Sequence, residues 1–263
     1  MGGGYFSGFS LHSALGLSSD DVALYKLLPR REDLVERFGV VFLPTVTDSA
    51  AERARKARLH LVYYRSPDDY LALTRPLSAS IEDVVSLAKL LREAPRPPRV
   101  FASLASERLS GFEELMRKFR GVVDGYEVEI GLMFHLYGRR RGFESFALDL
   151  LEELVRRAER PLVAKLSPGV PMSDDFLKLV SETGVAGLVF SPHVLYSIGD
   201  EVFRAHSPLL SKVFSHAWAR LSASLNLSTA YVTDAPVSSL DELALARAFD
   251  ILLVDTAALL ELV

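Results

Sequence analysis

Short apolar segments rich in β-branched residues alternate along the chain with longer amphipathic stretches. This order is typical of a parallel sheet whose strands are joined by crossover helices. Seven segments have a clear strand pattern: 40–46, 100–104, 126–133, 162–167, 187–191, 229–233 and 251–255. An eighth segment, near residues 5–10, has a weaker pattern. Eight strand–helix units in 263 residues predict an α/β fold, a (β/α)8 TIM barrel that forms a single domain over residues 1–263.

Helix starts are indicated by serines that are followed three residues later by an acid, since such pairs cap the first turn. The pairs are Ser18/Asp21, Ser49/Glu52, Ser80/Asp83, Ser110/Glu113 and Ser239/Glu242. The helix after the fourth strand has its apolar residues on one stripe: Phe143, Phe146, Ala147, Leu150, Leu151 and Leu154. Residues 59–64 predict a small inserted strand or hairpin before the third barrel strand. The last helix, 257–262, is truncated, which would leave apolar surface for a partner or the N-terminal segment to cover.

Composition narrows the function classes. The formal net charge of −4 provides no positive field for nucleic acid or an anionic membrane, and no apolar run approaches the roughly 20 residues of a membrane span. With no signal-peptide pattern, a cytoplasmic protein is expected. The absence of cysteine excludes disulfides, thiolate metal sites and a cysteine nucleophile. The absence of Gln, the single Asn and the 23 Arg against 7 Lys favour a thermophile, although a GC-rich genome would also explain the Arg bias.

Several segments resemble those of one enzyme family, in the same order along the chain. Residues 161–168 (PLVAKLSP) are similar to the strand of dihydroorotate dehydrogenases that ends in Lys-Leu-Ser-Pro. Residues 39–47 (GVVFLPTVT), 129–131 in place of a Glu-x-Asn motif, 184–190 (GVAGLVF), 239–242 and 255–257 also match. The resemblance covers nearly the whole chain from Gly39 onward. It implies an FMN-binding barrel of pyrimidine biosynthesis, with its active site at the C-terminal ends of the strands.

Lys165 is the family residue that the chain retains most clearly. Alternation along its strand points Val163, Lys165 and Ser167 into the barrel and their neighbours toward the helices. In the family, this lysine lies against the flavin ring and stabilises its reduced, anionic form. The alternative is a buried ion pair with Glu129 on the neighbouring strand, because an unpaired buried lysine is costly. The residues alone leave both interpretations open.

The catalytic base of the family is missing. Its Cys or Ser lies after the fourth strand, where this chain has Phe134. His135 is the next residue and is a candidate base, although a partly buried loop histidine is the plainer interpretation. The family's Thr-Lys-Thr, which supplies a second flavin lysine, corresponds to Leu43-Pro44-Thr45.

The phosphate site of the family is also altered. Its Gly-Gly loop corresponds to Ala235-Pro236, and proline has no N–H to donate. The carboxylates of Asp234 and Asp255 would repel a phosphate dianion. We therefore expect that the chain does not bind FMN in the way that the family does, and no cofactor is predicted. If FMN does bind, the residues expected to hold it are Lys165, Ser191, Ser239 and Thr256.

Other polar groups are less specific. Arg139, Arg140 and Arg141 form a cluster at the catalytic end that could bind an anionic substrate, or be a solvated turn. His193, His206 and His216 lack a metal-ligand spacing, so no metal site is predicted. Trp218 is expected on the core face of a helix.

Three functional hypotheses remain at this stage. The first is a degenerate, non-catalytic barrel that forms a homodimer or, as a partner subunit, a heterodimer with a paralogous barrel that is active. The second is an active flavin-dependent dihydroorotate dehydrogenase or related oxidoreductase that uses Lys165 and His135. The third is a barrel repurposed to bind another small anion near residues 139–141.

Overall fold

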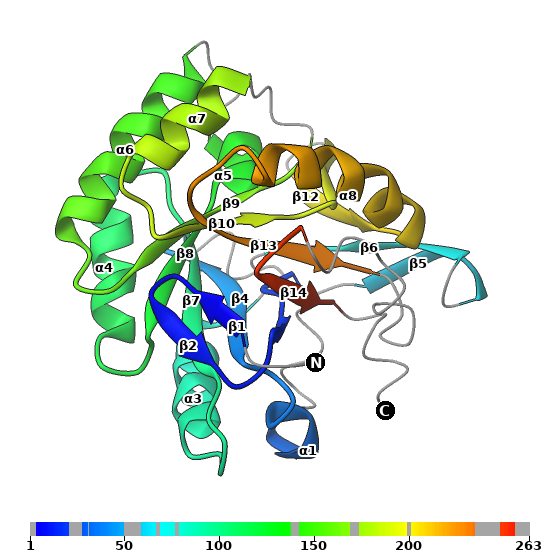
Figure 1. The fold of residues 1–263 in the computed structure, drawn as a ribbon, viewed down its shortest axis with the longest axis horizontal. Coiled ribbons are helices and arrows are strands. Elements are labelled where there is room, and N and C mark those ends of the chain that lie inside the picture. The colour runs from blue at the N-terminus through cyan, green and yellow to red at the C-terminus, as the bar shows by residue number, and fades with distance from the viewer. Residues whose placement is uncertain are drawn as a thin grey trace.

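The computed structural model shows a closed barrel of eight parallel strands with helices packed around it (Figure 1). It describes residues 4–20, 28–30, 32–49, 59–66, 69–76, 79–137, 142–168, 174–198, 201–234 and 248–255. The strand order is β10-β13-β14-β3-β4-β7-β8-β9, and β9 pairs with β10 to close the ring. The predicted (β/α)8 barrel is therefore confirmed.

The barrel strands agree with the predicted segments at seven of the eight places. They are β3 (Leu15–Leu17), β4 (Val40–Thr47), β7 (Arg99–Ala105), β8 (Gly125–Glu129), β9 (Leu162–Leu166), β10 (Gly187–Phe190), β13 (Ser228–Thr233) and β14 (Ile251–Val254). The prediction near residues 5–10 is wrong for the barrel, because the first strand is the short β3. Its three residues have too few positions to give a periodic signal.

Residues 4–11 form instead a hairpin, β1 (Gly4–Phe6) and β2 (Phe9–Leu11). The turn consists of Ser7 and Gly8, which both have positive φ angles, as a two-residue hairpin turn requires. The hairpin places Phe6 in the interior of the barrel, where its ring lies 6.1 Å from those of Phe42 and Phe101. The N-terminal segment therefore fills one end of the barrel with apolar side chains.

The helices lie outside the barrel. They are α1 (Glu32–Val35), α3 (Ile81–Arg92), α4 (Leu109–Phe119), α5 (Ile130–Tyr137), α6 (Phe143–Arg157), α7 (Asp174–Glu182) and α8 (Pro208–Ser222), with a 3-10 turn η2 (Leu28–Arg30). Trp218 is buried on α8 and stacks on Phe190 at 4.9 Å, as expected. Among the described residues, none of the helices has the length and apolar character that crossing a membrane requires.

Four local predictions have clear outcomes. Ser80 caps α3 and accepts a hydrogen bond from the backbone of Asp83, as predicted. Ser110 does not cap α4, because the helix begins one residue before it and Arg108 is the N-cap. Phe146 is 42% exposed at the edge of the otherwise buried stripe of α6. The fourth strand ends at Glu129 and α5 follows at once, because residues 130–136 are mostly apolar and, apart from Ile130, not β-branched, so they also suit a helix.

The remaining predicted caps, Ser18/Asp21, Ser49/Glu52 and Ser239/Glu242, involve residues outside the described ranges, and so does the last helix, 257–262.

A second sheet lies at the C-terminal end of the barrel. It contains four antiparallel strands in the order β11-β12-β6-β5 and is called the lid sheet below. Its strands are β5 (Leu59–Ser66), β6 (Asp69–Thr74), β11 (Val194–Ile198) and β12 (Glu201–His206). The β5–β6 hairpin follows β4 and confirms the predicted insertion. The β11–β12 hairpin follows β10, and the two hairpins join through β12 and β6.

The interior of the barrel has an apolar half and a charged half. Alternation along each strand points every second side chain inward. Toward the N-terminal ends, these side chains form an apolar cluster with Phe6 that includes Val163, Val189, Val232 and Leu253. Two residues further along β9 and two beyond Val232 and Leu253, the inward side chains are charged. A polar site therefore lies at the mouth of the barrel, beneath the lid sheet.

Replacement of Phe6 by alanine is predicted to lower the free energy of unfolding by about 3–5 kcal/mol, because it empties a buried aromatic site. Tyr5→Ala is the matched control, because Tyr5 is 60% exposed on the same strand and should change stability by no more than about 0.5 kcal/mol. Guanidinium unfolding of the variants measures both values. Equal losses would show that the hairpin does not anchor the barrel.

Candidate functional site

Nine buried ionisable side chains meet at the C-terminal ends of the barrel strands. They are called the mouth cluster here: Asp20, Glu127, Glu129, Lys165, His193, Arg204, His206, Asp234 and Asp255. None is more than 3% exposed. They come from β8, β9, the loops after β3, β10, β13 and β14, and the lid strand β12. The lid sheet thus contributes two of the charged groups itself.

Lys165 points into the barrel, as its position on β9 predicts. Its Nζ donates to Ser19 Oγ at 2.8 Å and to Asp20 Oδ1, and it lies 3.2 Å from Glu129 Oε2. An ammonium group has three N–H donors, and these three contacts use all of them. Burial lowers the pKa of Lys165, but the carboxylates of Asp20 and Glu129 outweigh that effect and raise it. The lysine is therefore charged and paired within the protein.

Asp20 is the carboxylate with the most partners in the cluster. Its Oδ1 binds Lys165 Nζ and lies 2.5 Å from Arg204 Nη1. Its Oδ2 lies 2.7 Å from His193 Nδ1 and accepts from Ser191 Oγ at 3.2 Å. Burial alone would raise the pKa of Asp20, but the positive charges of Arg204 and Lys165 hold it well below its usual range. Asp20 therefore stays ionised. Its contacts connect the loop after β3 to the barrel strand β9, to the loop after β10 and to the lid sheet.

Glu127 is a buried carboxyl group with a raised pKa. Its Oε1 accepts from Ser19 Oγ at 2.6 Å, and Ser19 in turn accepts from Lys165. Burial raises the pKa of Glu127 to about 7; the charge of Lys165 opposes this shift, whereas that of Glu129 adds to it. Glu127 is therefore the group of the cluster that titrates near neutral pH.

Two histidines and two aspartates form the other half of the cluster. His193 Nε2 lies 3.0 Å from Asp234 Oδ1, and His206 Nδ1 lies 2.7 Å from Asp255 Oδ2. The two imidazole rings are 4.2 Å apart. Burial opposes the charged imidazolium, but the carboxylates of Asp255 and Asp234 raise the pKa of His206 to about 10. Burial likewise disfavours charge on His193, and nearby carboxylates, Asp234 first, raise its pKa as well.

The alternation of β12 brings the lid into this cluster. Arg204 and His206 lie two residues apart and both point toward the barrel mouth, where Arg204 Nη2 lies 3.0 Å from Glu129 Oε2. His206 Nε2 lies 2.7 Å from Thr74 Oγ1 on the paired lid strand β6. Asp20, Glu127 and Arg204 are functional-site residues that were not predicted from the sequence. An arginine and a histidine two apart in a short strand were the signal that could have indicated an inward polar face.

The spacing of the histidines in the sequence did not predict a metal site. It also did not predict that His193 and His206 lie side by side in the folded protein. The two residues are 13 positions apart, on opposite ends of the β11–β12 hairpin, so only the folded hairpin brings them together. The third histidine, His216, lies apart from the cluster and is exposed on α8.

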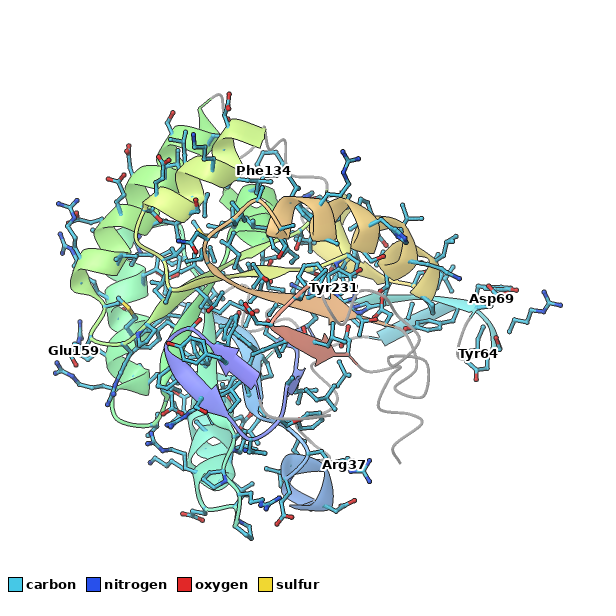
Figure 2. All side chains as sticks on the ribbon, in the orientation of Figure 1. Arg37, Tyr64, Asp69, Phe134, Glu159 and Tyr231 are labelled. Atoms are coloured by element: carbon cyan, nitrogen blue, oxygen red, sulfur yellow. The ribbon has the colours of Figure 1, made fainter. Side chains whose placement is uncertain are left out.

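His135 and Phe134 lie on α5 rather than on a loop. His135 Nδ1 is 3.5 Å from Ser197 Oγ on β11, so this histidine contacts the lid sheet. Phe134 packs edge-on against Phe143 of α6 at 5.0 Å, and Figure 2 shows it on the helical side of the structure. Ser191 is buried and binds Asp20. Ser239, Thr256 and Arg139, Arg140 and Arg141 lie outside the described residues.

Comparison with known proteins gives one relative in sequence. No protein-family model matches the chain. Over 147 residues the chain is 30% identical to the catalytic subunit of dihydroorotate dehydrogenase B (NAD(+)) from Methanopyrus kandleri. The matched segment covers 54% of this chain and 45% of that protein, so it spans less than half of the relative's length.

Solved structures with a similar fold include three proteins of low sequence identity. A putative lactate oxidase of Pediococcus acidilactici has a TM-score of 0.54 at 11% identity, over 96% of this chain and 65% of that chain. The BexX/CysO complex of Amycolatopsis orientalis has 0.51 at 12%, over 98% and 85%. N-acetylneuraminate lyase of Mycoplasma synoviae has 0.51 at 13%, over 90% and 62%. These likenesses show the fold, and the sequence match relates this (β/α)8 barrel to dihydroorotate dehydrogenases.

Removal of the Asp20 charge is predicted to be strongly destabilising. Asp20→Asn should lower the free energy of unfolding by about 3–5 kcal/mol, because Lys165 and Arg204 then share too little buried negative charge. The control is Asp69→Asn at the tip of the lid sheet, whose ion pair is exposed and should contribute no more than about 1 kcal/mol. Chemical unfolding measures both. A loss no larger than that of the control would contradict the central role of Asp20.

The raised pKa of Glu127 predicts a stability that falls as the pH rises. Between its unfolded pKa and about 7, the folded protein keeps a proton that the unfolded chain has lost. The free energy of unfolding should therefore fall by about 2 kcal/mol between pH 5 and pH 7, relative to Glu127→Gln, which does not titrate. Denaturant titrations of both proteins across this range test the difference. Parallel curves would contradict the shift.

Proposed function

We propose that the chain is a non-catalytic, dihydroorotate dehydrogenase-like barrel that acts as a partner subunit of an active paralogue in pyrimidine biosynthesis. The observation that carries this proposal is the state of Lys165. In the family that the sequence resembles, this lysine serves the flavin, whereas here Ser19, Asp20 and Glu129 occupy all three of its donors. The residue that suggested flavin chemistry is thus fully used by the protein itself.

The residues of the mouth do not fit FMN. A flavin that approached Lys165 would have to displace Asp20 or Glu129 and leave its charge buried without a partner, which typically costs several kcal/mol. Arg204 from the lid sheet also fills this space, with its guanidinium between the two carboxylates. Asp234 and Asp255 bring negative charge to the strand ends where FMN barrels bind phosphate.

The alternative of an active oxidoreductase has little support from the positions of its parts. Phe134, which stands in place of the base, packs against α6, and His135 contacts the lid strand β11. The anion-binding alternative depends on Arg139, Arg140 and Arg141, which lie outside the described residues. Loss of the base and occupation of the flavin lysine together favour the non-catalytic role.

The surface supports a role in assembly. Val62, Tyr63 and Tyr64 are 57%, 48% and 53% exposed on β5, which is an edge strand of the lid sheet. Figure 2 shows Tyr64 and Asp69 at the end of a hairpin that extends away from the barrel. Adjacent exposed apolar residues on an edge strand are typical of a surface that pairs with another chain. The curated relative is named as a catalytic subunit, which fits a partner that carries the activity.

The first test is the absorbance of the purified chain after incubation with excess FMN and desalting. We expect no retained flavin absorbance, because Lys165 has no free donor, while the catalytic paralogue treated in parallel retains FMN. Stoichiometric FMN on this chain that is lost in Lys165→Met would overturn the proposal and favour the active-enzyme alternative.

The second test is co-expression with the catalytic paralogue and capture through a tag on this chain. The two barrels should co-purify, and Val62→Glu combined with Tyr64→Glu should lower the yield of the complex at least tenfold. Arg65→Glu, on the same exposed strand, is the control for charge change and should leave the complex intact. A stable monomer that ignores the paralogue would contradict the assembly role.

A further inference from the structure

Four side chains of the mouth cluster direct one ligand atom each toward a common point. They are called the His/Asp site here: His193, His206, Asp234 and Asp255. The two aspartates directly follow the barrel strands β13 and β14, and the two histidines flank the lid hairpin. Their ligand atoms all lie within 4.8 Å of one another, and all four residues are buried.

The spacing of these atoms fits the coordination shell of one metal ion. The separations are 3.0 and 3.4 Å from His193 Nε2 to Asp234 Oδ1 and Asp255 Oδ2. From His206 Nδ1 to the same two oxygens they are 3.7 and 2.7 Å. Ligands at about 2.0–2.1 Å from a tetrahedral Zn²⁺ ion are separated by roughly 3.4 Å. The four atoms therefore need only small shifts to surround such an ion.

The atoms on the far side of three of these residues are held by other groups. His193 Nδ1 lies 2.7 Å from Asp20 Oδ2, and His206 Nε2 lies 2.7 Å from Thr74 Oγ1. Asp234 Oδ2 accepts from the backbone N–H of Ser207 at 2.9 Å. A carboxylate or hydroxyl on the outer nitrogen of a histidine is the usual second layer around a metal, because it fixes the ring and its tautomer. This layer is independent of the convergence of the inner atoms.

The arrangement of acceptor atoms in the His/Asp site also suits a cation. A neutral His193 that donates from Nδ1 to Asp20 presents the lone pair of Nε2 to the oxygens of Asp234 and Asp255. Three acceptors then face one another in a buried volume, which is unfavourable unless positive charge lies between them. Lys165 and Arg204 are already paired with Asp20 and Glu129. One divalent ion that displaces the protons of His193 and His206 would balance the negative charges of Asp234 and Asp255.

We infer that His193, His206, Asp234 and Asp255 bind one divalent transition-metal ion of the zinc class as a closed structural site. Two imidazole nitrogens and two carboxylate oxygens suit a borderline ion such as Zn²⁺, and four protein ligands without an open position are typical of structural zinc. The ion ties the β11–β12 hairpin of the lid sheet to the ends of β13 and β14. This inference does not depend on the proposed function, since a bound Zn²⁺ ion is compatible with either outcome of the flavin test.

The experiment measures metal content and coordination in the full chain. Protein stripped with a chelator and dialysed against micromolar Zn²⁺ should contain one ion per chain by elemental analysis and by native mass spectrometry. Substitution with Co²⁺ should give the intense visible d–d bands of a tetrahedral site. The midpoint of thermal unfolding should rise by at least 5 °C when Zn²⁺ is restored. No bound ion after dialysis, or Co²⁺ with only the weak bands of an octahedral ion, would overturn the inference.

Variants locate the ion. His206→Gln and Asp255→Asn should each reduce Zn²⁺ affinity at least a hundredfold, with circular dichroism as the check on folding. His216→Gln is the matched control, because it removes an exposed histidine of α8 outside the site and should retain one ion per chain. Should both ligand variants fail to fold, the stoichiometry and the Co²⁺ spectrum of the unaltered protein decide the question. Equal Zn²⁺ binding by His206→Gln and His216→Gln would place the ion elsewhere and overturn the assignment.

Discussion

Burial of positive charge at the barrel mouth is the constraint on which the arrangement of this end of the molecule depends. Lys165 points inward because β9 alternates, and a fully buried ammonium is stable only when negative charge surrounds it. Asp20 and Glu129 supply that charge, and Arg204 enters from the lid sheet to share it. The loop after β3, the strands β8 and β9 and the lid sheet are therefore held together by one network of ion pairs.

Most of the fold could be predicted from the sequence because periodic apolar segments directly reflect the barrel. Alternation on β9 correctly oriented Lys165, alternation on β8 correctly oriented Glu129, and their ion pair was one of the two interpretations of the sequence. β3 was missed because three residues carry no period, and α5 was read as strand because short apolar runs suit both structures. Asp20 gave no local signal, and Arg204 gave only its spacing from His206, since their roles arise when residues far apart in the chain meet.

The lid sheet changes the meaning of the family resemblance. In sequence, its two hairpins are insertions after β4 and β10, and neither carries a recognisable motif. In space, β12 and β6 pair above the mouth and bring Arg204, His206 and Thr74 to the strand ends where related barrels hold ligands. These polar side chains therefore contact one another within the chain, across the junction of barrel and lid sheet.

The mouth cluster is built from segments that lie far apart in the chain, which affects how the chain folds. The partners of Asp20 are separated from it by 145 residues for Lys165 and 173 for His193. Contacts between residues so far apart carry a high cost in loop-closure entropy, and a high contact order slows the folding of a domain. Before these contacts form, each charged group remains hydrated. The mouth therefore loses its water only when the lid sheet docks, because Arg204 and His206 arrive on β12.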